Sequence, residues 1–262
     1  MWPNNRILEL FGIELPIIQA PMAGSALSDM VVPVSQAGGL GSLACALLSV
    51  EHARKELDAI RRRTSRPINA NFFCHQRSRD DGTRQMKWRR RLDAYYIQLQ
   101  ADDNRPNSTL TPFDEKMCDL VMESHPEVVS FHFGLPDKNL LLRVKSAGAK
   151  VLSSATSVDE ARWLEDQGCD AIIAQGFEAG GHRGMFLSED VSTQVGTMAL
   201  VPQVVDAVRV PVIAAGGIAD ARGIVAAFAL GAAAVQIGTA YLHCPEAQIS
   251  PPYRQSLQGL RR

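Results

Sequence analysis

The stretch AIIAQGFEAGGHRG, residues 171–184, decides the fold. Its first four residues are apolar and β-prone, which predicts a buried parallel strand. Four glycines in the nine residues 176–184 let the backbone turn tightly and approach a flat ligand. His182 lies within this turn, flanked by Glu178 and Arg183. Because ligand-contacting loops follow the carboxyl ends of strands in α/β enzymes, the stretch predicts a strand that ends in a binding loop. A surface histidine on a flexible loop is the alternative.

Further apolar, β-prone runs of this kind recur along the chain. Most successive runs start 21 to 28 residues apart, about the length that a strand and its crossover helix need. Ser157 with Glu160 predicts a capping box that opens one of these helices. With the strand at Ala171, eight such units predict a TIM (β/α)8 barrel, a single domain over residues 1–262. The other seven strands are expected to start near Pro16, Gly39, Pro67, Val128, Lys150, Pro211 and Ala234.

Two longer gaps, after the third and sixth strands, mark insertions on the strand-to-helix side of the barrel. The first, residues 75–110, is rich in charged residues and holds Trp88, Tyr95 and Tyr96 among them. We interpret it as a helical flap insertion over the barrel mouth. A solvated surface excursion is the alternative.

Composition favours a soluble enzyme of the cytoplasm. The net charge of −1 gives no reason to expect a nucleic acid or an anionic membrane as partner. No apolar run is long enough to cross a membrane, and the N-terminus does not resemble a signal peptide. The five cysteines are scattered without a C-x-x-C pair, which fits reduced thiols and predicts no metal site.

The loops after the last two strands have the pattern of a phosphate site. Gly216 and Gly217 lie between a strand and the start of a helix, and Gly238 and Thr239 follow the final strand. Free backbone N–H groups and the positive end of a helix dipole at such places can hold a phosphate. In barrels this site characteristically uses the loops after strands seven and eight. Tight turns without a ligand are the alternative.

A glycine pattern near the N-terminus imitates a dinucleotide site. Residues 39–44, GLGSLA, match the G-x-G-x-x-A fingerprint, which must follow a strand and open a helix. Here the pattern follows a helical segment and begins a strand. We therefore exclude an NAD site at this position.

Other strand ends carry side chains suited to a ligand. Pro21 fixes a turn after the first strand, beside Met22. Asn69 and Asn71 alternate onto one face of the third strand, and their amides can both donate to and accept from a heterocycle. His132 lies on the fourth strand; a lone strand histidine is more often a core residue, but a position at the carboxyl end of a barrel strand favours a role in the site.

These segments together resemble the nitronate monooxygenase family, once called 2-nitropropane dioxygenases, and specifically its class I branch. The resemblance spans nearly the whole chain in order. The Glu-Ala-Gly-Gly-His motif is shared with related FMN-dependent enoyl-acyl-carrier-protein reductases, whereas Asn-Phe-Phe-Cys-His and Ser-Phe-His-Phe-Gly look like the nitronate enzymes. The matching segments are residues 19–24, 37–41, 69–75, 112–115, 130–134, 178–184, 215–218 and 236–239.

The resemblance implies a barrel that holds FMN non-covalently, with His182 as the catalytic residue over the flavin ring. It also implies that relatives continue well beyond the segment that matches residues 244–247. We expect Pro21, His132 and Gly216 to complete the cofactor site. The residues that the resemblance places against FMN are Met22, Asn71, Gln175, Gly180, Gly181, Gly217, Gln236, Gly238 and Thr239.

The leading hypothesis is therefore an FMN-dependent oxidation of alkyl nitronates, and of nitroalkanes if a base is available, by O₂ to a carbonyl compound and nitrite. Histidine, which titrates near pH ~6.5, can hold the anion when protonated or take a proton when neutral. One alternative is an NAD(P)H-dependent FMN reductase of the enoyl-ACP reductase II or quinone reductase type. The other is a shortened FMN-binding barrel without turnover, whose uncovered apolar surface would favour a homo-oligomer.

Overall fold

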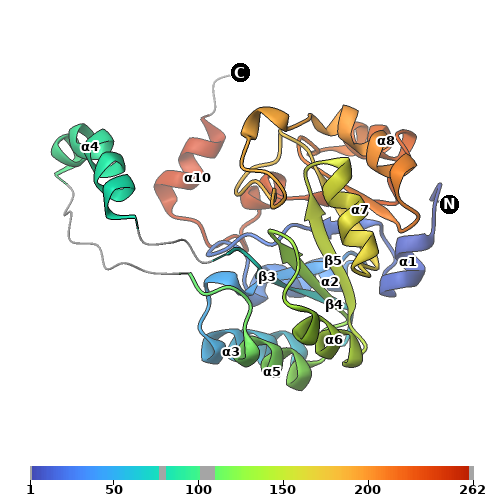
Figure 1. The fold of residues 1–262 in the computed structure, drawn as a ribbon. Coiled ribbons are helices and arrows are strands. Elements are labelled where there is room, and N and C mark those ends of the chain that lie inside the picture. Colours follow the sequence, from blue (N-terminus) through green and yellow to red (C-terminus); the bar gives the residue numbers. More distant parts are fainter. Residues whose placement is uncertain (1, 77–80, 101–109, 260–262) are drawn as a thin grey trace.

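The computed structural model describes residues 2–76, 81–100 and 110–259. Eight strands and the helices between them form a barrel (Figure 1). The strands are β1 (Ile17–Gln19), β2 (Gly41–Ala44), β3 (Ile68–Phe73), β4 (Val128–His132), β5 (Lys150–Ala155), β6 (Ala171–Gln175), β7 (Val212–Ala215) and β8 (Ala234–Ile237).

The strands pair in parallel in the order β1-β8-β7-β6-β5-β4-β3-β2. A bridge between Ile18 and Leu40 joins β1 to the chain just before β2. There the N–H of Leu40 donates to the carbonyl of Ile17 and the N–H of Gln19 donates to the carbonyl of Leu40, both at 3.0 Å. The two end strands of the sheet therefore meet, which confirms the predicted TIM barrel.

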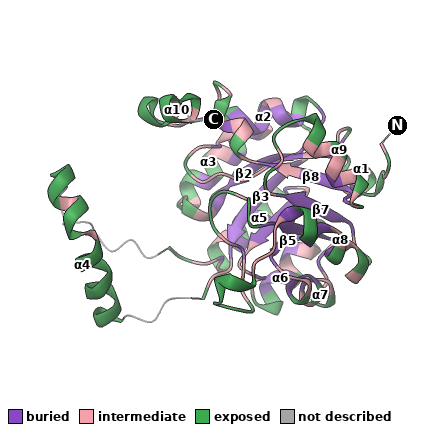
Figure 2. Cartoon of the chain, turned by 90° about the horizontal axis from the view of Figure 1, so that it is seen from above, coloured by how far each residue is buried: buried purple, intermediate pink, exposed green. Residues whose placement is uncertain are grey.

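The helices cover the outside of the barrel. Figure 2 shows the buried strands inside a layer of helices whose outer faces are exposed. The helices are α1 (Arg6–Phe11), α2 (Ser28–Gln36), α3 (Val50–Arg61), α4 (Gly82–Leu99), α5 (Glu115–Ser124), α6 (Lys138–Ser146), α7 (Val158–Asp166), α8 (Thr197–Ala207), α9 (Ala221–Ala229) and α10 (Pro251–Gln258), with short 3-10 turns η1 (Cys45–Leu47), η2 (Val191–Thr193) and η3 (Thr239–His243). In the described residues, no helix is long and apolar enough to cross a membrane.

Two hydrophobic layers hold the barrel together. One fills the space between strands and helices and includes the fully buried Phe72 and Phe131. The other lies inside the barrel, where Ile18 and Ile213 pack with Phe11 of α1. Because α1 contributes to this inner cluster, it closes the amino end of the barrel. The opposite, carboxyl end is left for the loops that follow the strands.

The predicted capping box at α7 forms only in part. The Ser157 hydroxyl accepts from the N–H of Glu160 at 3.2 Å. The Glu160 carboxylate, however, does not return to Ser157. It is buried, accepts from the N–H of Thr156 at 2.7 Å, and accepts from the N–H of Phe186 at 2.7 Å. A buried carboxylate needs several donors, and these donors tie α7 to the loop after β6.

The glycine fingerprint that we excluded as an NAD site serves helix packing. A Cβ on Gly41 would lie 2.3 Å from the carbonyl oxygen of Val31 in α2. Glycine therefore lets α2 approach β2 closely.

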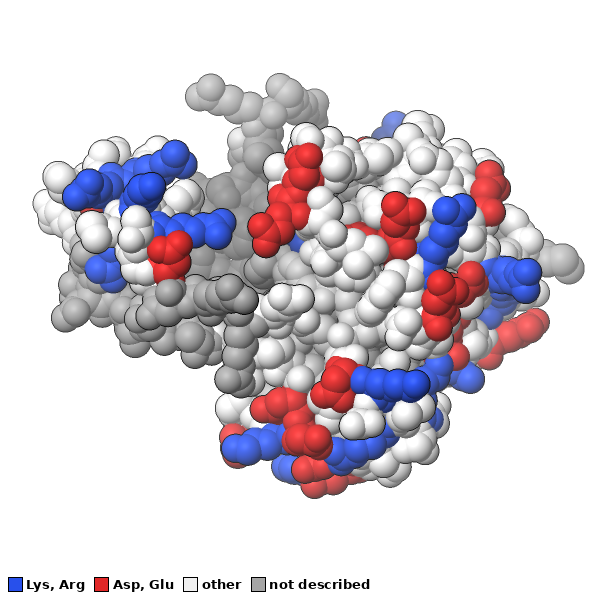
Figure 3. Space-filling model, viewed as in Figure 1, with Lys and Arg blue, Asp and Glu red and all other residues white. Residues whose placement is uncertain are grey.

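The first insertion contains the 18-residue helix α4. None of its residues is buried, and both views show it clear of the barrel (Figures 1 and 2). Its many Lys and Arg side chains gather on its surface (Figure 3). That this insertion acts as a flap over the barrel mouth stays a prediction.

Candidate active site

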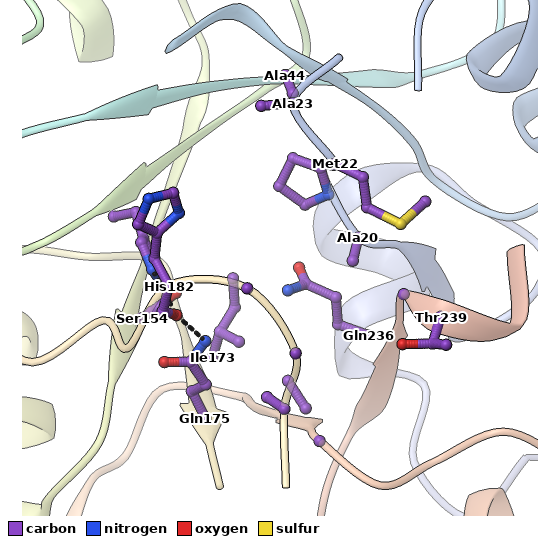
Figure 4. Close-up of a pocket in the computed structure, with 18 of the residues that line it drawn as sticks. Ala20, Met22, Ala23, Ala44, Ser154, Ile173, Gln175, His182, Gln236 and Thr239 are labelled. Atoms are coloured by element: carbon purple, nitrogen blue, oxygen red, sulfur yellow. Dashed lines mark hydrogen bonds between the residues drawn. The ribbon is translucent and has the colours of Figure 1, made fainter. Parts of the chain in front are cut away.

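A cavity of about 540 Å³ lies at the carboxyl ends of the strands. Figure 4 shows His182, Ser154 and Gln175 on one side of it and Met22, Gln236 and Thr239 on the other. Thirteen of the site residues predicted from the sequence line this one cavity, so residues far apart in the chain converge there, while their roles stay predictions. These residues are Pro21, Met22, Asn71, His132, Gln175, Gly180, Gly181, His182, Gly216, Gly217, Gln236, Gly238 and Thr239.

The two predicted asparagines lie at different depths in the barrel. Asn71 lines the cavity, and its Nδ2 donates to the Ser130 hydroxyl at 2.9 Å, which directs its amide nitrogen away from a ligand. Asn69 is fully buried and donates to the Ser42 hydroxyl at 3.0 Å without reaching the cavity. The expectation that both amides meet a heterocycle is therefore wrong for Asn69. Asn69 lies two residues before Asn71 on β3, on the same face of the strand but deeper in the barrel.

His182 stands on the loop after β6 with its side chain exposed to the cavity. Its ring contacts Phe73 edge to face, with the centroids 5.2 Å apart and the planes at 72°. Phe133 lies against the same ring at 5.8 Å. Two aromatic walls thus restrict the imidazole, while one side stays open to the cavity.

The main chain of His182 is held by two side chains from the barrel. Gln175, at the end of β6, donates from Nε2 to the carbonyl of His182 at 3.0 Å. Its Oε1 accepts from the N–H of Gly184 at 2.7 Å. His132 Nε2 lies 3.3 Å from the same carbonyl of His182. The loop therefore rests on the ends of β4 and β6.

The state of the His132 ring follows from its partners. A carbonyl oxygen can only accept, so the Nε2 that faces it carries the hydrogen. Nδ1 is then an acceptor, and the Ser154 hydroxyl, 3.0 Å away, donates to it. Burial is the main cause that lowers the pKa of His132, to about 4, and the nearby charge of Arg183 adds to it. His132 is thus neutral near pH 7.

Arg183 and Glu178, on either side of the glycine turn, stabilise the loop itself. The Arg183 guanidinium donates to the carbonyls of Gly176 at 2.8 Å, of Phe177 at 3.1 Å, and of Ala179. Because one planar guanidinium bonds to three carbonyls of the loop, it fixes the conformation of the turn.

The Glu178 carboxylate ties the same turn to α8. It accepts from the N–H of Thr197 at 2.7 Å and from its hydroxyl at 2.8 Å. Burial opposes the charge, but these hydrogen bonds and the Arg183 charge outweigh it and hold the pKa of Glu178 below its usual value.

The loops after β7 and β8 present backbone donors to the cavity. Gly216 and Gly217 have φ of 116° and 69°, which side chains rarely adopt. Among the residues that the structure describes, the N–H groups of Gly217 and Thr239 have no acceptor. The N–H groups in the first turn of α9 are less available, because the Asp220 carboxylate accepts from the N–H of Arg222 at 2.9 Å. A phosphate would therefore be held by the two loops rather than by α9.

A polar atom without a partner faces the same cavity. Gln236 lines the cavity, and its Oε1 is buried with no hydrogen-bond partner in the described residues. A buried carbonyl oxygen of this kind is costly unless a ligand donates to it. Unpaired loop amides at one end and an amide acceptor in the middle fit a phosphorylated heterocycle such as a flavin nucleotide. The described residues contain no cluster of three His, Cys, Asp or Glu that could hold a metal ion.

Sequence reasoning missed several residues of the wall. Ser154 is the inward member of a Ser153-Ser154 pair on β5, and strand alternation could have identified it. Phe73 follows the predicted Asn71 on β3 by the same alternation. Tyr253 comes from α10 and is 46% exposed. Nothing in the local sequence around Tyr253 indicates that α10 reaches the cavity.

An eight-stranded α/β barrel with glycine loops and a histidine loop at the carboxyl ends of its strands has the organisation of a barrel enzyme. The sequence profile of nitronate monooxygenase matches residues 4–259. The chain belongs to the nitronate monooxygenase family, whose members are flavin-dependent oxidoreductases.

Named relatives support this assignment, and solved structures share the fold. The chain is 43% identical to a nitronate monooxygenase of Paraburkholderia phytofirmans over 98% of its length and 71% of the relative. It is 41% identical to a nitronate monooxygenase of Pseudomonas aeruginosa, over 98% of the chain and 74% of the relative. Nitroalkane oxidase from Streptomyces ansochromogenes superposes with a TM-score of 0.86 at 35% identity, over 96% and 72% of the two chains. FabK from Thermotoga maritima superposes at 0.74 with 31% identity, over 95% and 66%.

Proposed function

We propose that this protein binds FMN in the strand-end cavity and oxidises alkyl nitronates with O₂ to a carbonyl compound and nitrite. The observation that carries the proposal is the convergence of the thirteen predicted residues on one cavity, with the His182 ring at its wall. Membership of the nitronate monooxygenase family supports the substrate class. The name of the Streptomyces relative, nitroalkane oxidase, supports testing the neutral nitroalkane as well.

The residues present divide the work of holding FMN. The loop amides of Gly217 and Thr239 would donate to the phosphate, where Gly216 leaves room for it. The unpaired Oε1 of Gln236 would accept from an N–H of the ring. Asn71, whose nitrogen already donates to Ser130, would present its amide oxygen. When bound, FMN supplies the electron acceptor that no side chain of the protein provides.

His182 would act on the substrate directly. A nitronate is a small anion, and a protonated imidazole beside it would hold the charge close to the cavity. A neutral imidazole would instead take the α-proton of a nitroalkane. The flanking Phe73 and Phe133 rings keep water from that side of the imidazole and leave an apolar wall for an alkyl group.

A nitrite assay on His182→Ala tests this role. We expect the variant to bind FMN and remain yellow while it loses turnover by about 10²- to 10⁴-fold, the usual contribution of an acid–base group. The matched control is His125→Asn, at the carboxyl end of α5 in the left-handed conformation that asparagine tolerates. Wild-type turnover by His182→Ala on both nitronate and nitroalkane would refute the role.

The second candidate is an NAD(P)H-dependent FMN reductase that acts on an enoyl thioester or a quinone. The Glu-Ala-Gly-Gly-His motif at residues 178–182, which the chain shares with enoyl-acyl-carrier-protein reductases, supports this candidate. The fold is also similar to that of FabK from Thermotoga maritima. Anaerobic mixing with NADH separates the two candidates. Rapid bleaching of the flavin by NADH, without nitrite from any nitronate in air, would favour the reductase.

A further inference from the structure

Phe133, directly after β4, has a backbone conformation that a bulky residue rarely adopts. Its φ is 67°, in the left-handed region, where a side chain disfavours the conformation by about 5- to 30-fold. Glycine would adopt this φ without that penalty. Strain of this kind persists only where the surroundings enforce it, and it clusters at functional sites. A ring at position 133 is therefore expected to serve a purpose that glycine could not.

Hydrogen bonds on both sides of Phe133 hold the strained turn in place. The carbonyl of His132 accepts from the N–H of Cys74, which follows β3, at 2.8 Å. The carbonyl of Gly134 accepts from the Ser153 hydroxyl of β5 at 2.8 Å. A rotation of φ at Phe133 into the ordinary range would move these two carbonyls relative to each other and break at least one of the bonds. The neighbouring strands thus fix the direction in which the ring leaves the backbone.

The Phe133 ring lies among four other rings. Its centroid is 4.5 Å from that of His132, 5.3 Å from that of Phe73 and 5.8 Å from that of His182. His75 lies at 6.3 Å. All four pairs meet edge to face, an arrangement that aromatic rings favour at these distances. Phe73, His132 and His182 line the cavity, whereas Phe133 is not one of the described residues that line it and packs against the other rings from behind.

The orientation of the His182 imidazole depends on this packing. The hydrogen bonds from Gln175 and His132 hold the main-chain carbonyl of His182 but leave the torsions of its side chain free. In the described part of the chain, neither ring nitrogen of His182 has a hydrogen-bond partner. The imidazole is instead bounded by Phe73 at 5.2 Å and by Phe133 at 5.8 Å. Because Phe133 also packs against Phe73, removing the Phe133 ring loosens both walls.

We propose that Phe133 is a positioning residue whose strained backbone holds its ring against Phe73 and His182 and thereby fixes the orientation of the His182 imidazole at the cavity. Its effect on turnover rests on the proposed function, because Phe133 acts through His182. Its effect on the imidazole itself does not. A ring that served only to fill the core would support the fold without changing how the imidazole is oriented.

NMR of the His182 side chain tests the orientation in the whole chain as purified. With ¹³C- and ¹⁵N-labelled histidine, and His182 assigned by comparison with His182→Ala, we expect nuclear Overhauser contacts between the imidazole and the Phe133 ring. We also expect the order parameter of a rigid group. In Phe133→Leu, which keeps an apolar side chain but no ring, we expect a lower order parameter. Phe133→Tyr, which keeps the ring, should leave it at the wild-type value.

Kinetics then tests the consequence for the reaction. We expect kcat for nitrite formation by Phe133→Leu to fall about 10- to 100-fold, because a misplaced reacting group loses rate on this scale. Phe133→Tyr should keep most of the turnover. The affinity for FMN should stay at the wild-type value in both variants, because Phe133 does not line the cavity. General damage to the barrel would instead lower FMN affinity and kcat together.

Glycine and alanine at position 133 separate the strain from the ring. Neither variant has a ring, so kcat should be equally low in both, but only Phe133→Gly relieves the strain. We expect the unfolding equilibrium constant from urea titrations to be about fivefold larger for Phe133→Ala than for Phe133→Gly. If Phe133→Leu fails to fold, Phe133→Gly replaces it in the NMR and kinetic measurements.

The matched control is His125, which also has a left-handed φ, of 45°, but lies at the end of α5 and outside the cavity. His125→Gly should likewise be more stable than His125→Ala. Both His125 variants should keep wild-type kcat, because they change backbone strain without touching the rings around His182.

An unchanged order parameter of the His182 imidazole in Phe133→Leu would overturn the proposal, whatever its kcat. So would an FMN affinity that falls in proportion to kcat, or equal stability of Phe133→Gly and Phe133→Ala. Wild-type kcat beside a lower order parameter would overturn the consequence for the reaction. A wild-type protein that forms no nitrite at all would instead refute the proposed function, and the NMR result would still decide the role of Phe133.

Discussion

The His132 imidazole should make the folded protein sensitive to mild acid. Burial is the first cause that lowers its pKa from the ordinary 6.5 to about 4, against the opposing hydrogen bond to the carbonyl of His182. Between these two pH values the unfolded chain holds a proton on His132 that the folded chain lacks. The free energy of unfolding therefore falls as pH drops through this window. Above pH 6.5 neither state holds the proton, so the penalty vanishes.

The size of the effect follows from the two pKa values. The difference corresponds to about 3 kcal/mol of lost stability at pH ~4. Because the ring borders a cavity that solvent can enter, we expect the measured loss to be nearer about 2 kcal/mol. The change to make is His132→Gln, which cannot titrate but can still donate to the carbonyl of His182.

Urea unfolding at a series of pH values measures this loss directly. Wild type should lose about 2 kcal/mol more than His132→Gln between pH ~7 and pH ~4. The two proteins share every other ionisable group, so the contributions of those groups cancel in the comparison. If both proteins lose stability in parallel over this range, the reasoning about His132 is wrong.

Two glycine substitutions separate the cofactor site from the scaffold. Gly216→Ala places a methyl group 2.8 Å from the Thr197 hydroxyl and 2.9 Å from the N–H of Ala179, at a φ of 116°. We expect it to weaken FMN binding at least about tenfold in a fluorescence titration, because the cradle must shift; unchanged affinity would argue against a phosphate there. Gly41→Ala forces α2 away from β2 and should cost about 1–3 kcal/mol in urea unfolding. Its affinity for FMN should stay at the wild-type value, and a loss of affinity would contradict the separation of the two sites.

Most of the barrel could be predicted because each strand is followed by turn residues that are recognisable in the local sequence. All eight strands lie within a few residues of their predicted starts, and the regular spacing alone indicated βα units. The glycine loops could be predicted for the same reason: a glycine between a strand and a helix is a local signal. Gly216 and Gly217 indeed adopt positive φ at the cavity.

Contacts between distant segments could not be predicted in the same way. The Glu160 carboxylate meets Phe186, and the Ser154 hydroxyl meets His132, only after the barrel has formed. Sequence spacing indicates which face of a strand a residue occupies but not how deep it lies, so Asn69 was assigned to the ligand with Asn71. Tyr253 reaches the cavity from α10, beyond the last strand, and how that helix packs against the barrel is not indicated by its local sequence.

The most direct measurement is nitrite formation by the purified protein, with and without FMN, from propionate 3-nitronate and from a simple alkyl nitronate. We expect oxygen-dependent nitrite from at least one of them in proportion to bound FMN, and none after the FMN is removed. A protein that binds FMN yet forms no nitrite from either nitronate, or one that binds no FMN at all, would contradict the central claim.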